Sequence, residues 1–419
     1  MKIFKFGGAS VKDAPGVKRV ASVLNHFPEE KILVVVSAMG KTTNALEALV
    51  ASFLKGDTQL CSKQVQDLKD YHNSIATELF EGQEDAKVFL DIEQLFTQLE
   101  AILSAPPIGS FNRVYDQIVS FGELLSTKLV SAYLNSINYE NRWLDSRRLI
   151  RTDQNFRSAR VDWSFTRRMV NEAVQEGMRY VVQGFIGSDD DLNPTTLGRE
   201  GSDYTASVLA YVLKAEEVVI WKDVPGVLNG DPKVFEKTEL LKHISYREAI
   251  ELAYYGASVI HPKTIQPLQE RGIPLRVKSF EAPENQGTTI TEGAALEPFM
   301  SCFIRKEKQQ LIGLSTRDLA FIAEDHLSQI YKVFHQFGLR VNLSQHSATS
   351  SYFCVNDDPI ATPQLIEQLK QNFDVSMVSE LSLYTVRHYD DKAIAYIQSL
   401  GRKILEQVSA DTYQIVLRE

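Results

Sequence analysis

Short runs of apolar residues alternate with longer segments of helical periodicity over the first two thirds of the chain. The runs predict buried strands at 2–6, 31–36, 180–183, 218–221 and 274–277. This βαβ rhythm predicts an α/β fold, with a mostly parallel sheet and helices on both of its faces. Ligands of such sheets bind beyond the carboxyl ends of the strands. We therefore expect one rim to collect the loops that begin at Gly7, Ser37, Gly184 and Lys222.

Residues 45–101 interrupt the rhythm, because they contain few strand signals. The segments 65–79 and 86–103 have helical spacing, and the sequence Ala-Pro-Pro-Ile-Gly at 105–109 ends the run. We interpret this region as a helical excursion from the sheet that would cover the rim.

The composition shifts after the turn-rich connector 281–287, and the remainder predicts a smaller α+β unit with the order β-α-β-β-α-β. Its first helix keeps apolar spacing from Leu327 to Phe337, with Gly338 as the residue after the C-cap. Its second helix is expected to begin with Thr362 as the N-cap and Pro363 at the first helical position. A last segment, 381–419, has strands at each end and one short helix between them.

Composition and charge argue against several classes of protein. The chain has 419 residues, which suggests two or three domains, and a net charge of −9, which argues against a general nucleic-acid binder. No apolar run is long enough to span a bilayer, and the N-terminus lacks a signal-peptide pattern. The cysteines Cys61, Cys302 and Cys354 are few and far apart, which favours a reducing, cytoplasmic location over disulfides or a zinc site.

The end of the first strand carries the first candidate chemistry. In Lys5-Phe-Gly-Gly8-Ala-Ser10, the glycines would let backbone amides approach an anion, and Lys5 would add positive charge. The alternative is a plain strand-to-helix turn with an exposed lysine. The sequence 40–42, Gly-Lys-Thr, does not have P-loop spacing, and no dinucleotide-binding glycine motif follows the first strand.

A second polar, glycine-punctuated loop lies at 195–203. It precedes a helix, so it offers amides and a helix N-terminus to an anion, and Arg199 would grip a carboxylate with two hydrogen bonds. Asp203 would orient a metal or a lysine; alternatively, Ser202 or Asp203 is simply the N-cap. Glu123, which opens another helix, would recognise an amino group or only favour the helix dipole.

The turn-rich segment after the strand at 218–221 would hold a nucleotide with its metal, or form only a turn; it contains Lys222, Asp223 and Lys233. For His261 a structural role is favoured over a catalytic one. Together these residues predict phosphate-binding chemistry beside an Arg/Glu pair. A phosphoryl transferase fits this set, and so does a binding protein for a zwitterion.

The same motifs resemble, in order, those of the aspartokinases. Lys5–Ser10 is similar to that family's N-terminal signature. The later motifs that resemble the family are 34–38, 121–123, 184–187, 195–203 and 223–226. The resemblance is strong over 1–290 and weak in the tail. It implies an amino-acid-kinase fold of three layers over 1–290, followed by an ACT-like, ferredoxin-like region over 300–419.

The resemblance also implies an activity: transfer of the ATP γ-phosphoryl group to the side-chain carboxylate of L-aspartate, the first step of lysine, threonine and methionine biosynthesis. ATP would come with Mg²⁺, no side-chain metal site is expected, and the ACT-like region would form a homodimer or a larger assembly. The implied catalytic residues are Lys5 and Asp203. The implied ATP-binding residues are Lys5, Gly7, Gly8, Ser10, Lys222, Asp223, Lys233 and Ser258. The implied aspartate-binding residues are Ser37, Thr43, Glu123, Phe185 and Arg199.

The chain departs from the family's usual pattern at several positions. Ser258 stands where a nucleotide-binding lysine is usual, Lys222 where a threonine is usual, and Lys233 where an arginine is usual. We hypothesise that Lys222 replaces the charge missing at 258. Glu200 replaces a small residue beside Arg199, and Leu228 replaces a tyrosine.

The tail departs as well. Residues 305–380 resemble one ACT unit, whereas 389–403 is too short for the regulatory helix and effector loop of a second. We therefore expect a truncated second unit, weak or absent inhibition by lysine and threonine, and no dehydrogenase domain. The alternatives to an active aspartokinase are a non-catalytic paralogue that binds amino acids or nucleotides, and a kinase acting on glutamate or a nucleotide.

Overall fold

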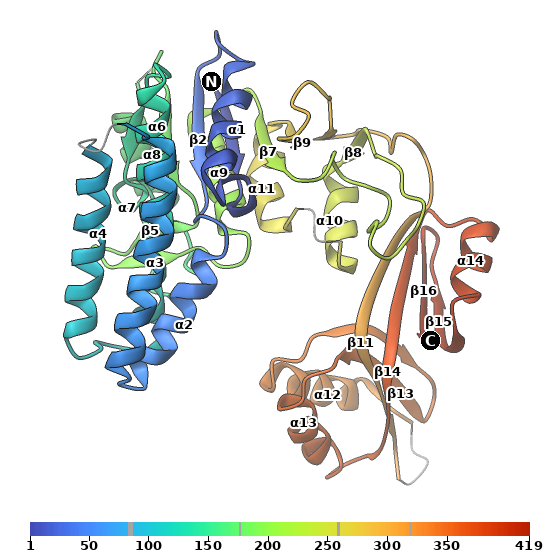
Figure 1. The fold of residues 1–419 in the computed structure, drawn as a ribbon. Coiled ribbons are helices and arrows are strands. Elements are labelled where there is room, and N and C mark those ends of the chain that lie inside the picture. The colour runs from blue at the N-terminus through green and yellow to red at the C-terminus, as the bar shows by residue number, and fades with distance from the viewer. Residues whose placement is uncertain (83–86, 176, 258–259, 318–320) are drawn as a thin grey trace. The chain divides into compact units, whose positions relative to one another are not determined.

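The computed structural model describes residues 1–82, 87–175, 177–257, 260–317 and 321–419 (Figure 1). The described residues form two compact units. The first contains 1–227, 240–250 and 259–297, and the second contains 228–239, 251–258 and 298–419. The chain thus enters the second unit twice before its C-terminal part, and the predicted boundaries at 290 and 300 stay a prediction.

The first unit is built on an eight-stranded sheet with the order β3-β4-β2-β1-β7-β9-β10-β8. All neighbouring strands pair in parallel except β9 and β10, which confirms the mostly parallel sheet. Its strands are β1 (Lys2–Phe6), β2 (Ile32–Val36), β3 (Arg142–Leu144), β4 (Tyr180–Gln183), β7 (Val218–Lys222), β8 (His243–Ser245), β9 (Leu275–Ser279) and β10 (Thr288–Thr291). A separate hairpin joins β5 (Ile186–Ser188) and β6 (Pro194–Thr196).

Helices cover both faces of this sheet, as the sequence predicts. On one face, Phe4, Phe6, Val34 and Val36 share an apolar cluster with the helices of the N-terminal third. These helices are α1 (Ala14–Asn25), α2 (Thr42–Leu54), α3 (Thr58–Leu79), α4 (Lys87–Ser104), α5 (Phe111–Val119) and α6 (Phe121–Ser136). Helix α9 (Gly201–Leu213) packs on β1, β2 and β7, and its neighbours are α8 (Trp163–Ala173) and α11 (Pro262–Arg271). The shorter elements are η1 (Gly8–Val11), α7 (Ser146–Leu149) and α10 (Tyr246–Tyr255).

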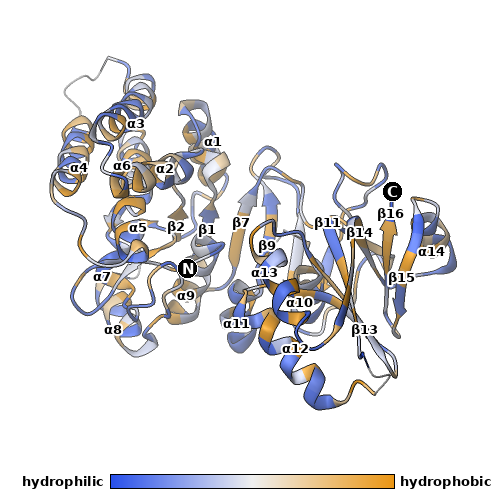
Figure 2. Ribbon diagram, turned by 90° about the horizontal axis from the view of Figure 1, so that it is seen from below, coloured by the Kyte–Doolittle hydropathy of each residue, from blue (hydrophilic) through white to orange (hydrophobic). Residues whose placement is uncertain are grey.

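The predicted helical excursion is present as α3 and α4, which pack on each other, and α3 also packs on α1, α2 and α6. Both carry hydrophobic and hydrophilic stretches side by side, the colouring of amphipathic helices (Figure 2). On α3, the Tyr71 hydroxyl donates a 2.5 Å hydrogen bond to the carbonyl of Lys12. The excursion therefore reaches the loop that follows β1.

The second unit is an α+β structure with a six-stranded antiparallel sheet, in the order β12-β13-β11-β14-β16-β15. Its elements are β11 (Cys302–Ser315), α12 (Glu324–Gln336), β12 (Val341–His346), β13 (Ser350–Asn356), α13 (Ala361–Leu369), β14 (Asp374–Arg387), α14 (Asp391–Gln398), β15 (Arg402–Val408) and β16 (Thr412–Arg418). The predicted order β-α-β-β-α-β is confirmed from β11 to β14. Gly338 follows α12 with a φ of 67°, a left-handed conformation that suits its predicted place.

The predicted start of α13 is wrong. The helix begins at Ala361, and Thr362 is buried inside its first turn. The side chain of Asp358 accepts hydrogen bonds from the amides of Ile360 and Ala361, at 2.9 and 2.8 Å, and so starts the helix earlier than the sequence predicts.

The last segment contains the expected short helix, α14, before the β15–β16 hairpin. Ala393 and Ile397 of this helix pack against Tyr413 and Ile415 of the hairpin. Whether this arrangement is a truncated ACT unit stays a prediction. Within the described parts of the chain, no helix is long and apolar enough to cross a membrane.

Candidate active site

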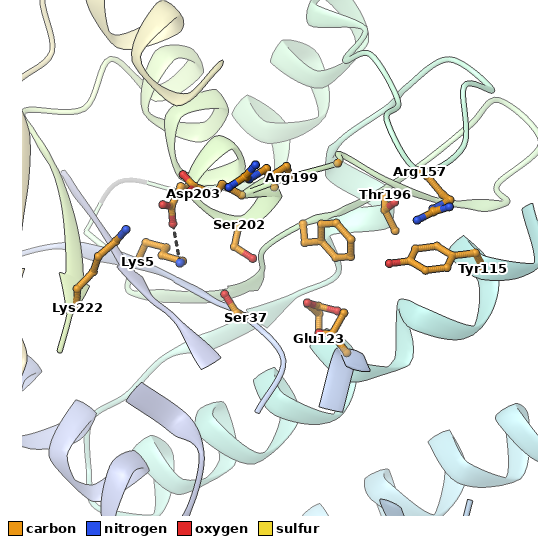
Figure 3. A pocket seen from close by; sticks show the side chains of 15 residues that line it. Lys5, Ser37, Tyr115, Glu123, Arg157, Thr196, Arg199, Ser202, Asp203 and Lys222 are labelled. Atoms are coloured by element: carbon orange, nitrogen blue, oxygen red, sulfur yellow. Dashed lines mark ion pairs between the residues drawn. The ribbon is translucent and has the colours of Figure 1, made fainter. Parts of the chain in front are cut away.

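A cavity of about 440 Å³ opens in the first unit, beyond the carboxyl ends of β1, β2 and β7 (Figure 3). The predicted rim is therefore present. Among the predicted site residues, those that line the cavity are Lys5, Ser37, Thr43, Glu123, Phe185, Arg199, Asp203 and Lys222.

Lys5 and Asp203 form a buried ion pair in this cavity. Lys5 Nζ lies 2.6 Å from Asp203 Oδ1, and the two side chains are 10% and 3% exposed. Lys5 lies near the end of β1, whereas Asp203 lies in the first turn of α9, where the helix dipole favours a carboxylate. Neither Ser202 nor Asp203 is the N-cap, which corrects that alternative: Glu200 holds the N-cap position with a φ of 52°.

Glu123 lies in the first turn of α6 and is 2% exposed. Its Oε1 accepts a 3.2 Å hydrogen bond from the amide of Ala38, in the loop after β2. Among the described residues, its Oε2 has no hydrogen-bond partner. Burial raises the pKa of this carboxyl to about 8, because the charged form is removed from water without a cation. A cationic group beside Oε2 would favour the ionised form of this carboxyl.

The loop between β6 and α9 carries Arg199, whose side chain lies at the cavity wall. Figure 3 shows its guanidinium on the side of the cavity where Asp203 lies. Phe185 also lines this region with a φ of 69°, a left-handed conformation that costs free energy for a residue with a Cβ. Two hydrogen bonds hold its backbone: its amide donates to Thr205 Oγ1 at 2.9 Å, and its carbonyl accepts from the amide of Leu197 at 2.8 Å.

The departure at Glu200 has a structural explanation. Its Oε2 accepts a 2.8 Å hydrogen bond from the amide of His261, just before α11. Two residues later, Lys263 Nζ donates to the carbonyl of Leu197 at 2.9 Å and lies 4.5 Å from the ring centre of Tyr204. The start of α11 thus holds the Arg199 loop by these contacts. His261 is the N-cap of α11, and its Nδ1 accepts from the amide of Lys263, which agrees with a structural role.

Gly7, Gly8 and Ser10 lie beside the cavity and not in its lining. Gly8 is required by packing, since a Cβ there would lie 2.7 Å from the carbonyl oxygen of Ala38. The turn therefore brings the loops after β1 and β2 together, and the amide of Gly40 donates to the carbonyl of Gly8 at 3.0 Å. The phosphate-binding role of these residues stays a prediction.

The remaining predicted nucleotide residues are spread out. Lys222 ends β7 at the cavity, and the next residue, Asp223, is exposed and does not line it. Lys233 belongs to the second unit, where its amide donates to Asp231 Oδ1 at 2.9 Å. Ser258 lies outside the described residues, so the exchange of charge between 258 and 222 stays a hypothesis.

Two residues of the lining, Tyr115 and Arg157, were not predicted. Neither belongs to a motif that sequence reasoning recognises, and only the folded chain brings them to Glu123. Beside them, the buried carboxylate of Asp116 accepts hydrogen bonds from the amides of Arg157 and Thr196, at 2.9 and 2.8 Å, and from Thr196 Oγ1 at 2.7 Å. Burial raises the pKa of Asp116 despite these donors.

This arrangement suits a small zwitterion bound next to an anionic donor group. Glu123 would take a cation, and the lysines and arginines of the lining would take anions. In the described part of the chain, no group of three or more His, Cys, Asp or Glu residues is placed to hold a metal ion.

The chain is similar in sequence to a known protein family and to several characterised enzymes. The amino acid kinase family model matches residues 1–279. Aspartokinase 1, chloroplastic, of Arabidopsis thaliana is 32% identical over 378 residues, which are 87% of this chain and 65% of that protein. The chain thus spans just under two thirds of the length of this plant relative. The lysine-sensitive aspartokinase 3 of Escherichia coli K12 is 30% identical over 352 residues, 83% of this chain and 76% of that protein.

Solved structures give the same relationship. The crystal structure of E. coli aspartokinase III in complex with aspartate and ADP (R-state) matches with a TM-score of 0.82 at 25% identity. The structure of that enzyme with lysine and aspartate (T-state) matches with a TM-score of 0.83 at 26% identity. Both matches cover 100% of this chain and 96% of the other.

Proposed function

Because this chain belongs to the amino acid kinase family and, within it, to the aspartokinases, we propose that it transfers the γ-phosphoryl group of ATP to the side-chain carboxylate of L-aspartate. The product would be 4-phospho-L-aspartate. One observation carries the proposal: a single cavity holds the Lys5–Asp203 ion pair and the buried Glu123, whose Oε2 has no partner among the described residues.

The acceptor binds at the Glu123 end of the cavity. The carboxylate of Glu123 pairs with the ammonium group of aspartate and thereby offsets its own burial. Arg199 pairs with the α-carboxylate, and Phe185 packs beside the substrate. Ser37 and Thr43 complete this part of the lining. These contacts direct the side-chain carboxylate of the acceptor toward Lys5.

Phosphoryl transfer needs positioning and neutralised charge more than a covalent group on the enzyme. The acceptor carboxylate is already ionised at neutral pH, so it attacks the γ-phosphorus directly and ADP leaves with the bridging oxygen. Lys5 neutralises the transferring group, and Asp203 fixes the ammonium of Lys5 at 2.6 Å. The amides of Gly7 and Gly8, together with Ser10, contact the phosphates.

ATP enters as its magnesium complex. Mg²⁺ would balance part of the charge on the phosphates and so add to the neutralisation by Lys5. Lys222 binds the nucleotide from the end of β7, and Asp223 follows it in the chain.

The reaction is the first step toward lysine, threonine and methionine, carried out by a catalytic domain over 1–290. Residues 300–419 are an ACT-like region that joins two or more copies of the chain. A cytoplasmic location is supported by three free, buried cysteines, which suit a reducing compartment.

ADP release by the purified protein tests this proposal. With Mg-ATP, we expect turnover that depends on L-aspartate and is at least about tenfold slower with L-glutamate, because a longer acceptor misplaces its carboxylate. Turnover with glutamate alone would indicate a different amino-acid kinase. A folded protein that binds aspartate without releasing ADP would indicate a sensor.

A further inference from the structure

Arg157 has an unusual backbone conformation at the wall of the candidate site. Its φ is 67°, in the left-handed region that favours glycine over residues with a Cβ. Such strain persists where the surrounding structure holds it, and it gathers at functional sites. The side chain lines the same cavity as Glu123 and lies at the opposite end from Lys5 (Figure 3).

The buried carboxylate of Asp116 holds this conformation. The amide of Arg157 donates a 2.9 Å hydrogen bond to Asp116 Oδ2, and Asp116 is fully buried. The same carboxylate accepts two hydrogen bonds from Thr196, three residues before Arg199. One buried anion therefore fixes the positions of both the Arg157 loop and the strand that leads to Arg199.

The guanidinium of Arg157 lies over two aromatic rings, and its charge also acts on the nearby carboxyl of Asp116. It lies 4.4 Å from the ring centre of Tyr115 and 5.6 Å from that of Phe111. Tyr115 is itself held, because its hydroxyl donates a 2.6 Å hydrogen bond to Glu47. Within the described residues, the guanidinium makes no hydrogen bond or ion pair, so its donors are available to a ligand of the cavity.

The charges of the cavity identify what these donors would bind. An acceptor whose ammonium pairs with Glu123 carries its α-carboxylate on the same carbon, and this group needs a cation near Glu123. Figure 3 places the guanidinium of Arg199 toward Asp203, whereas Arg157 and Tyr115 lie on the other side of Glu123. A planar guanidinium stacked on a ring is suited to bind a carboxylate with two hydrogen bonds.

We propose that Arg157 is a specificity-determining residue that binds the α-carboxylate of the acceptor together with Arg199. The inference rests on the proposed function and assigns to this site a second arginine. The site would then select acceptors with a free α-carboxylate beside the ammonium, and it would discriminate against amides or esters of that group.

Steady-state kinetics of three variants test this role. Arg157→Gly removes the guanidinium and suits the left-handed backbone, so the protein should melt no lower than the wild type. Arg157→Lys keeps the charge and loses the planar donor pair. The control is Arg160→Gln, an exposed arginine of the same loop that does not line the cavity. Each variant is measured with L-aspartate and with its α-amide as the acceptor.

For Arg157→Gly we expect the KM for aspartate to rise roughly tenfold or more, since a charge-assisted hydrogen-bond pair is lost. The KM for ATP should stay within about twofold of the wild-type value. The ratio of kcat/KM for aspartate to kcat/KM for the α-amide should fall by the same factor as the KM for aspartate rises. Arg157→Lys should lie between wild type and Arg157→Gly, and Arg160→Gln should match wild type.

Several outcomes would overturn the inference. One is an unchanged aspartate KM in Arg157→Gly, and another is an equal loss for aspartate and its α-amide. A third is the same shift in Arg160→Gln, which would indicate only the general charge of the loop. Wild-type protein without aspartate-dependent turnover would instead refute the proposed function.

Discussion

At the scale of single residues, the Lys5–Asp203 pair affects both the stability of the fold and the proposed reaction. Both side chains are almost fully buried. Removing two charges from water costs free energy, and only their mutual attraction offsets this cost, so the pair by itself adds little to stability. In the proposed reaction, the pair would supply a fixed cation at the end of β1.

A pair of substitutions separates these two roles. Lys5→Met leaves Asp203 buried without its cation and should lower the free energy of unfolding by roughly 3–5 kcal/mol. The double variant Lys5→Met/Asp203→Leu removes both charges and should recover most of that loss. Both should lose at least about a hundredfold in kcat. Thermal unfolding and ADP release measure the two effects. A double variant as unstable as the single one would contradict the assignment.

Glu123 predicts a pH dependence. Its pKa of about 8 means that the carboxyl of the free enzyme is mostly protonated at pH 6, whereas pairing with an ammonium group needs the ionised form. The kcat/KM for aspartate should therefore rise roughly tenfold per pH unit from 6 toward 8 and level off above that. The carboxylates of aspartate titrate far below this range. A pH profile of the wild type measures this.

The variant Glu123→Gln provides the control, since it keeps the shape of the side chain and cannot ionise. Its kcat/KM should be lower and flat between pH 6 and 8. If the wild type were equally flat over this range, Glu123 would not bind the ammonium group.

At the scale of elements, the five central strands and the start of α6 were predictable, whereas the outer strands β3, β8 and β10 and the starts of α9 and α13 were not. The residues of β2, Ile32–Val36, are all buried, and a short run of Val, Ile and Leu is the usual pattern of a strand in a parallel sheet. The start of α9 depends instead on Glu200, whose left-handed backbone and hydrogen bond to His261 come from a distant segment.

The residues of the candidate site also fall into those that the sequence predicts and those that it does not. Lys5, Glu123 and Arg199 lie in motifs that are local in sequence, so their chemistry is visible before folding. Arg157 and Tyr115 lie in segments without a motif, and only tertiary structure brings them together over Asp116. Sequence reasoning has no local signal for such residues.

Helix α3 contains a buried histidine that predicts acid sensitivity. His72 is fully buried against Phe96, and burial lowers its pKa from 6.5 to about 4. Because the folded state disfavours protonation, the neutral ring stabilises the fold above pH 6.5, and this contribution is lost as the pH falls from 6.5 toward 4. The full loss is roughly 3 kcal/mol.

Melting temperatures between pH 7 and 4.5 measure this effect. The variant His72→Gln should be less stable at pH 7 and lose less on acidification than the wild type. His26→Gln is the matched control, since His26 also hydrogen-bonds a carbonyl four residues earlier but is exposed. Identical acid profiles of the wild type and His72→Gln would contradict the role of His72.

At the scale of the whole molecule, each compact unit has apolar clusters of its own. In the second unit, one cluster gathers around α12 and α13 and another around α14. The helix of the second cluster is short, Asp391–Gln398, and it is followed after a few residues by the β15–β16 hairpin. This leaves little chain for a second effector-binding loop.

The short α14 segment predicts weak feedback control. Lysine and threonine are added alone and together, at about ten times the concentration that would saturate an allosteric amino-acid site. The aspartate-dependent rate should then stay within about twofold of the rate without them. Rates at subsaturating aspartate measure this most sensitively. Strong submillimolar inhibition by either amino acid would show that the second unit holds a working effector site.

The most direct test of the proposed activity identifies the product. The purified protein is incubated with Mg-ATP, L-aspartate and hydroxylamine, which attacks an acyl phosphate to give a hydroxamate and inorganic phosphate. We expect aspartate β-hydroxamate in a one-to-one ratio with ADP, identified by mass spectrometry, and its loss in Lys5→Met. ADP formed without hydroxamate, or neither product from the folded protein, would contradict the assignment of an aspartate kinase.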